Sequence, residues 1–155
     1  MYSVFLHIVN LLNEQLSVYP LLYGSLGLGK RLSADLNADD VDVLIPEKYI
    51  KSEWDKLISI MNAAGYCLAD EHEHEFSNGN ITIAFAALES LTSFAGIDIS
   101  TIPIVEDEGN RFLLLELSDY LKVYEASSKD GYRKNVKNKQ DNIKISLIKK
   151  ALEDK

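Results

Sequence analysis

Two stretches near the N-terminus contain the residue types and spacings that phosphate and metal chemistry requires. The first is segment 23–31, YGSLGLGKR, which follows the apolar run 19–23. A strand that leads into a Gly-Ser turn and a basic, glycine-rich segment is typical of a phosphate-binding loop. The second is segment 39–46, DDVDVLIP, where strand alternation puts Asp40 and Asp42 on one face. Two carboxylates beside a phosphate loop predict a site for Mg²⁺ (or Mn²⁺) and a triphosphate.

Four residues of the first stretch are candidate phosphate ligands. Glycine at position 24 allows the backbone to approach a phosphate closely, and the hydroxyl and amide of Ser25 can donate hydrogen bonds to its oxygens. Lys30 and Arg31 add positive charge, and arginine is suited to bidentate phosphate contacts. We therefore predict a nucleotide-binding role for all four, with a solvated helix end as the alternative interpretation of the two basic residues.

The elements around these stretches predict an α/β (α+β) fold, a mixed β-sheet flanked by helices. Apolar spacing indicates an amphipathic helix over 2–17, and alternation indicates the acidic strand 40–45, which ends at Pro46. The remaining expected elements are a short helix within 25–34, a helix opening at 46–47 and ending at Gly65, strands 66–76, 81–86, 97–105 and 111–115, a helix within 87–95, and helices 117–125 and 132–152. We expect one domain over 1–155, with a core at about 17–115 and C-terminal helices at about 117–152.

Composition narrows the functional classes. The 155 residues are 46% hydrophobic and 26% charged, as in soluble globular proteins, and the formal net charge of −8 disfavours non-specific binding to nucleic acid or anionic membranes. Cys67 is the single cysteine, which excludes an intrachain disulfide and fits a reducing, cytoplasmic compartment. The N-terminal segment lacks the features of a signal peptide, and no window has the roughly 20 apolar residues of a membrane span.

The order of these motifs resembles the nucleotidyltransferase superfamily, which has the polymerase-beta-like fold. That pattern is a strand ending in Gly-Ser, a short helix, and a strand bearing acid-hydrophobic-acid, here Gly24-Ser25 and Asp40-Val41-Asp42. The resemblance implies attack of an acceptor hydroxyl on the α-phosphate of a nucleoside triphosphate, with pyrophosphate released and two metal ions held at the site. It implies an acceptor that is a small molecule or a protein, and it is compatible with a homodimer.

The resemblance also implies a third carboxylate on a later strand, but the expected strand 81–86, ITIAFA, has no acid. Asp98 and Glu75 are the two candidate replacements, Asp98 as a catalytic residue and Glu75 as a metal ligand. If neither reaches the metals, the chain is expected to be a non-catalytic binding or regulatory module of the same fold.

Two further patterns have alternative interpretations. On a strand, His72 and His74 would share one face and could hold a transition metal, although the simpler interpretation is a polar edge strand. A basic set in the C-terminal region is expected either to face the triphosphate or to be solvated, and it consists of Arg133, Lys134, Lys137, Lys139 and Lys144.

Overall fold

The N-terminal helix and first strand form as the apolar pattern requires. In the computed structural model, which describes residues 1–129 and 138–154, helix α1 (Tyr2–Leu16) buries one apolar face that includes Phe5 and Ile8. Ser17 then adopts the left-handed conformation with φ 53°, and this ends α1. The chain continues in extended form into strand β1 (Leu21–Tyr23).

The remaining elements have the following bounds. The helices are α2 (Gly24–Leu32), η1 (Glu47–Ile50), α3 (Trp54–Ala63), α4 (Ser90–Ala95), η2 (Ile99–Thr101), α5 (Leu117–Lys129) and α7 (Asn138–Glu153), of which η1 and η2 are 3-10 helices. The strands are β2 (Val41–Ile45), β3 (Cys67–Asp70), β4 (Glu75–Ser77), β5 (Thr82–Ala87), β6 (Ile104–Asp107) and β7 (Asn110–Leu113). Within the described residues, no helix is long and apolar enough to span a bilayer.

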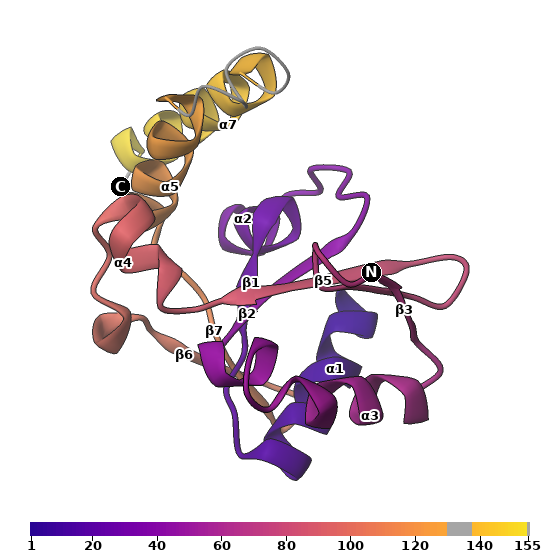
Figure 1. Cartoon of the computed structure of the whole chain (residues 1–155). Coiled ribbons are helices and arrows are strands. Elements are labelled where there is room, and N and C mark those ends of the chain that lie inside the picture. The colour runs from indigo at the N-terminus through magenta and orange to yellow at the C-terminus, as the bar shows by residue number, and fades with distance from the viewer. Residues whose placement is uncertain (130–137, 155) are drawn as a thin grey trace.

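The strands form one mixed sheet of seven in the order β3-β4-β5-β2-β1-β7-β6. Strand β2 lies at the centre, antiparallel to β1 and parallel to β5, while β1 is also parallel to β7. Two antiparallel hairpins, β3-β4 and β6-β7, complete the edges. Because β2 is paired on both sides, the acidic motif lies at a rigid position in the fold (Figure 1).

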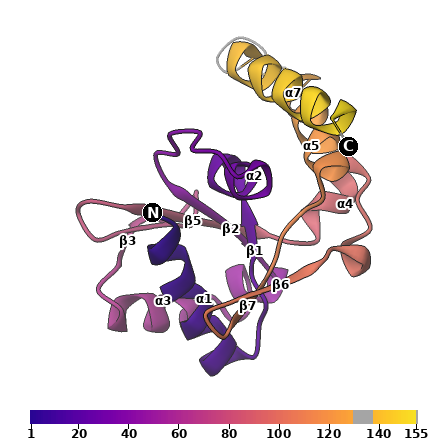
Figure 2. The ribbon, with the colours of Figure 1, turned by 180° about the vertical axis from the view of Figure 1, so that it is seen from behind.

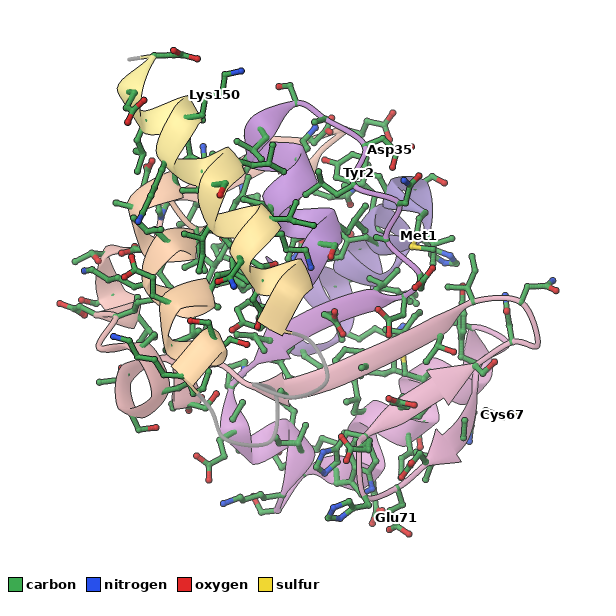
Figure 3. All side chains as sticks on the ribbon, turned by 90° about the horizontal axis from the view of Figure 1, so that it is seen from above. Met1, Tyr2, Asp35, Cys67, Glu71 and Lys150 are labelled. Carbon is green, nitrogen blue, oxygen red and sulfur yellow. The ribbon has the colours of Figure 1, made fainter. Side chains whose placement is uncertain are left out.

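Helices cover both faces of this sheet. Helices α1 and α3 lie on one face, while α2, α4 and the α5–α7 pair lie on the other (Figures 1 and 2). The view from above shows α7, in yellow, alongside α5, in orange (Figure 3). On the first face, the rings of Phe5 and Phe112 meet edge to face with centroids 5.1 Å apart. On the second face, the buried Tyr120 of α5 donates a hydrogen bond to the carbonyl oxygen of Leu22 at 2.9 Å. Gly27 makes this approach possible, because a Cβ there would lie 2.5 Å from the same oxygen.

The expected strand 66–76 is wrong as a continuous element. Strand β3 ends at Asp70, residues 71–74 form a turn, and β4 begins at Glu75. The Asp70 carboxylate accepts a hydrogen bond from the amide of Glu73 at 3.1 Å, which stabilises the turn locally. The polar run therefore reverses the chain, and β3 pairs with β4 as a hairpin.

The expected strand 97–105 is also shorter than predicted. Its first part is the 3-10 helix η2, and β6 begins only at Ile104, after Pro103. The helix expected from 46–47 to Gly65 is divided into the 3-10 helix η1 and helix α3, with a turn at 51–53 between them. The other predicted helices and strands are present with shifted ends, including α4, which ends at Gly96 with φ 69°. The final helix is described from Asn138 onward, and the expected residues 132–137 lie outside the described part.

Candidate functional site

A cavity of about 920 Å³ opens between the sheet and the C-terminal helices. Both chemistry-bearing stretches line it: Gly24 and Ser25 from the start of α2, and Asp40 and Asp42 from the acidic segment. Among the described residues, its charged lining consists of Asp39, Asp40, Asp42, Glu73, Glu75 and Lys144. With five carboxylates and one ammonium, this described lining is strongly negative and favours cations.

Sheet register holds Asp42 against the Gly-Ser turn. Tyr23 of β1 pairs with Asp42 of β2, and Gly24 follows directly as the first residue of α2. A Cβ at position 24 would overlap the Asp42 carboxylate, with 3.1 Å to its Cγ. Gly24 also has φ 65°, which glycine adopts without strain. The absence of a side chain at position 24 therefore leaves the space that the carboxylate occupies.

The first turn of α2 is the second feature of this corner. The N–H groups of a helix's first turn have no partner within the helix, and they carry the positive end of the helix dipole. Because Gly24 and Ser25 open α2 and line the cavity, these donors lie at the cavity wall. Such a helix N-terminus suits an anionic oxygen.

Asp40 reaches the cavity from outside the strand. It lies in a bend one residue before β2, so the expected strand 40–45 begins one residue later, at Val41. Asp40 and Asp42 nevertheless line the same cavity, as expected from the acid-hydrophobic-acid spacing.

Glu75 lies on the same face of the sheet as Asp42. Ala84 of β5 is paired with Asp42 on one side and with Glu75 of β4 on the other, so the three residues form one row across the strands. All three line the cavity. Burial, together with the nearby carboxylates of Asp70 and Asp40, raises the pKa of Glu75 above its ordinary value. Glu75 therefore lies on the same face of the sheet as Asp42, and Ala84 of β5 lies between the two residues.

The donor set fits a hard divalent cation in its chemistry. Asp40 and Asp42 supply carboxylate oxygens, and both residues line the cavity beside the Gly24-Ser25 turn. Within residues 1–129 and 141–154, whose side chains are described, no three His, Cys, Asp or Glu side chains are clustered closely enough to hold a metal ion. Mg²⁺ commonly keeps water and substrate phosphate among its six ligands, so a carboxylate pair is sufficient to hold it together with a nucleotide.

Asp98 is not brought to the cavity, contrary to its expected role as the third carboxylate. It is the N-cap of η2, where its carboxylate accepts hydrogen bonds from the amide and hydroxyl of Ser100 at 3.0 and 2.7 Å. These hydrogen bonds lower the pKa of Asp98. The carboxylate thus stabilises a local turn.

Lys30 and Arg31 also lie away from the cavity. Arg31 donates from Nε to the carbonyl of Leu115 and from Nη2 to that of Leu114, at 2.9 and 3.0 Å. These bonds join the end of α2 to the chain that follows β7. Lys30 has its Nζ 3.8 Å from Asp107 and 4.3 Å from the ring centroid of Tyr2. Neither side chain lines the cavity that contains Asp42, so the structure does not bring Lys30 and Arg31 to the place where phosphate contacts were expected.

The turn at 71–74 separates His72 from His74. The side chain of His72 is 93% exposed, whereas the ring of His74 packs edge to face on Trp54 with centroids 4.9 Å apart. With φ 54° at His74, the two residues do not share a strand face. The geometry expected for a histidine metal site is therefore absent from this segment.

Helix α7 adds a cation and an apolar surface to the cavity. Lys144 lines it, with Nζ 5.2 Å from the ring centroid of Tyr124 in α5. The buried Asp141 accepts a hydrogen bond from the hydroxyl of Ser127 at 2.9 Å, which joins α7 to α5. Lys144 belongs to the basic set expected to face the triphosphate or solvent, and its side chain contributes to the cavity wall.

Helical apolar spacing alone would place all the large apolar residues of α7 in the core, but two of them lie outside it. Ile143 and Leu147 instead line the cavity and are 53% and 40% exposed. Ile145, Ile148 and Leu152 form the stripe that packs on the core. The sequence does contain a signal for this second surface. Ile143 and Leu147 are four residues apart, so they share a helix face that is separate from the stripe packed on the core.

Comparisons with known proteins agree with this architecture. No family model matches the chain. The chain is 41% identical over 152 residues to the uncharacterized protein YnaI of Bacillus subtilis (strain 168), covering 98% of this chain and 97% of that protein.

Two solved structures share the fold. ANT(2″)-Ia, in complex with adenylyl-2″-tobramycin, aligns over 96% of this chain and 97% of its own, with a TM-score of 0.50 and 11% identity. An antigenic nucleotidyltransferase-like protein from Paracoccidioides brasiliensis aligns over 94% of this chain and 73% of its own, with a TM-score of 0.64 and 16% identity. The expected fold is confirmed: the chain belongs to the same family as YnaI, and it has the nucleotidyltransferase fold.

Proposed function

We propose that this protein is a Mg²⁺-dependent nucleotidyltransferase that transfers a nucleotidyl group from a nucleoside triphosphate to a hydroxyl of a small-molecule or protein acceptor. The observation that carries the proposal is the convergence of Gly24, Ser25, Asp40 and Asp42 in one cavity of a nucleotidyltransferase fold. ANT(2″)-Ia binds adenylyl-2″-tobramycin, a small molecule that carries a nucleotidyl group, and this supports a small-molecule acceptor.

The residues have distinct roles in this proposal. Asp40 and Asp42 hold Mg²⁺, which, when bound, neutralises charge that develops on the entering and leaving oxygens. Ser25 and the first amides of α2 hold phosphate oxygens at the Gly24 turn. Lys144, on the opposite wall, adds positive charge toward the triphosphate. Electrostatic stabilisation of this kind commonly supplies much of an enzyme's rate enhancement.

Glu75 supplies the remaining carboxylate. Two observations support this role: Glu75 shares a face of the sheet with Asp42, and its raised pKa suits acceptance of a proton from the acceptor hydroxyl. We also propose a cytoplasmic location, since Cys67 is a free, exposed thiol.

The test is isothermal titration calorimetry with ATP, GTP, CTP and UTP in the presence of Mg²⁺. We expect at least one of the four to bind to the wild-type protein and to bind at least tenfold more weakly to Asp42→Asn. His72→Ala is the control, because His72 is exposed and lies outside the cavity. Absence of binding for all four nucleotides, or equal binding by Asp42→Asn, would refute the proposal.

A second candidate function is a non-catalytic nucleotide-binding module. Ala84 favours it, because this residue without a carboxylate is the direct neighbour of Asp42 in the sheet. Release of pyrophosphate from the bound nucleotide separates the two functions. Turnover that is lost in Glu75→Gln supports the enzyme, whereas binding without turnover under a broad set of hydroxyl acceptors supports the module.

A further inference from the structure

Large apolar side chains are exposed at one place next to the candidate metal site. Phe94 of α4 is 41% exposed, and Ile143 and Leu147 of α7 are 53% and 40% exposed. All three line the cavity. Among the described residues, the other large hydrophobic side chains with comparable exposure are Met1, Tyr19 and Ile104. Half of the exposed apolar set therefore converges on one cavity, which differs from the scattered distribution expected on a soluble surface.

The floor of the cavity changes from acidic to apolar along the strands. Ala84 and Ala86 are alternate residues of β5, so they share a face, and Ala84 lies beside Asp42. Two residues along a strand span roughly 7 Å, and this direction leads away from Asp42 and toward α4. These two methyl groups are small, whereas larger side chains at positions 84 and 86 would fill part of the cavity.

The walls above this floor are suited to a flat ring. Phe94 and Tyr124 contribute aromatic rings from two helices, and Ile143 and Leu147 contribute branched side chains from a third. Ligand pockets are typically apolar, with a few polar groups that fix the orientation of the ligand. Aromatic side chains can stack on any of the nucleobases, because every base has a flat π-face. A nucleoside triphosphate matches the two ends of the cavity. Its anionic phosphate chain suits a metal ion at the acidic end, and its flat base suits the apolar end.

We propose that Phe94, Tyr124, Ile143 and Leu147, above Ala84 and Ala86, form the subsite for the nucleobase. The inference rests on the proposed function, because it takes the phosphates to lie at Asp42 and Gly24. The wall offers mainly apolar and aromatic contact, and the Lys144 ammonium lies 5.2 Å from the centroid of the Tyr124 ring. The subsite therefore binds the base mainly by stacking and burial. It therefore accepts more than one of the four bases.

Comparison of a nucleotide with a phosphate chain that has no base tests this subsite. Binding of ATP, GTP, CTP and UTP and of inorganic tripolyphosphate is measured by calorimetry with Mn²⁺. We expect nucleotides to bind to the wild-type protein at least tenfold more tightly than tripolyphosphate. Phe94→Ser and the double variant Ile143→Ser/Leu147→Ser should each weaken nucleotide binding about tenfold, which is ~1.4 kcal/mol, and change tripolyphosphate binding by less than twofold.

Matched controls separate the subsite from general effects. Ile104→Ser changes an isoleucine that is 58% exposed on β6, outside the cavity, and should bind as wild type. Phe94→Tyr keeps the ring and should retain nucleotide affinity. Because all the substituted side chains are partly exposed, we expect each variant to fold, and its melting temperature is recorded beside the titration.

The outcomes that overturn the inference are distinct from failure of the proposed function. Equal affinity of nucleotide and tripolyphosphate, or unchanged nucleotide binding by the wall variants, overturns the base subsite alone. Equal weakening of both ligands also overturns it, because the wall would then act on the phosphate end. Absence of binding of both ligands to the wild-type protein overturns the proposed function and the subsite together.

Discussion

The contact between Gly24 and Asp42 yields the most direct prediction, for the variant Gly24→Ala. Its φ of 65° is a conformation that costs an L-residue about 1–2 kcal/mol. The new Cβ would also lie 3.1 Å from Cγ and 3.2 Å from Cβ of Asp42, closer than normal packing. The Asp42 carboxylate and Cγ can rotate away from the new methyl group, and the contact with the Asp42 Cβ needs a shift of only a few tenths of an ångström. The stability loss should therefore be close to the backbone strain, equivalent to roughly 2–8 °C in melting temperature for this chain length.

The same rotation should remove most nucleotide binding. We expect Gly24→Ala to weaken Mg²⁺-dependent binding of the preferred nucleotide at least tenfold in calorimetry, similar to Asp42→Ala. In the double variant Gly24→Ala/Asp42→Ala, the loss should not exceed that of Asp42→Ala alone, because both changes act through one carboxylate. If Gly24→Ala melts at the expected lower temperature yet binds nucleotide within twofold of wild type, the assignment of Asp42 as a ligand in its observed position is refuted.

Two further predictions concern stability. Gly27→Ala should lower the free energy of unfolding in urea by about 2–4 kcal/mol, because the new Cβ would overlap the Leu22 carbonyl and the Tyr120 hydroxyl. A stabilisation of about 1 kcal/mol, as for an unconstrained glycine within a helix, would contradict this close approach of α2 to Leu22 and Tyr120. Glu75→Gln should raise the melting temperature at pH 7 but not below about pH 4. Because the pKa of Glu75 is raised in the folded protein, the protonated carboxyl stabilises the fold below the unfolded-state pKa near 4.3, and this stability is lost as the pH rises through the folded-state pKa. Glutamine cannot ionise, so the substitution removes the cost of the charged carboxylate only at the higher pH. An equal change at both pH values would contradict that sign.

Local patterns predicted much of the fold and the centre of the site. Helix α1, the Gly24-Ser25 turn and strand β2 follow from signals within short windows, namely helical apolar spacing, turn chemistry and alternation. The order of these motifs predicted that the acidic strand lies beside the Gly-Ser turn, because consecutive elements are usually neighbours in space. The antiparallel pairing of Tyr23 with Asp42 confirms this.

Residues with long or turn-forming side chains were less predictable, because their partners are remote in sequence. Arg31 follows the phosphate-binding turn, yet it is held by the carbonyls of Leu114 and Leu115, more than 80 residues away. Asp98 has a local alternative, since a carboxylate two residues before Ser100 readily forms an N-cap. Charge and proximity in sequence indicate which groups are available, whereas tertiary contacts decide where those groups point.

The pairing of β4 with β5 explains how this chain can retain a carboxylate near the site although Ala84 adjoins Asp42. Strand β4 is antiparallel to β5, and its register puts Glu75 opposite Ala84 on the same face. Adjacent strands are about 4.8 Å apart, so Glu75 lies roughly one strand spacing farther from Asp42 than Ala84 does. The longer glutamate side chain, together with the small alanine between them, gives that carboxylate a path toward the Asp42 side of the cavity. Replacement of Ala84 by a large residue should therefore separate Glu75 from Asp42, and a carboxylate at position 84 should make Glu75 dispensable for any turnover the protein has.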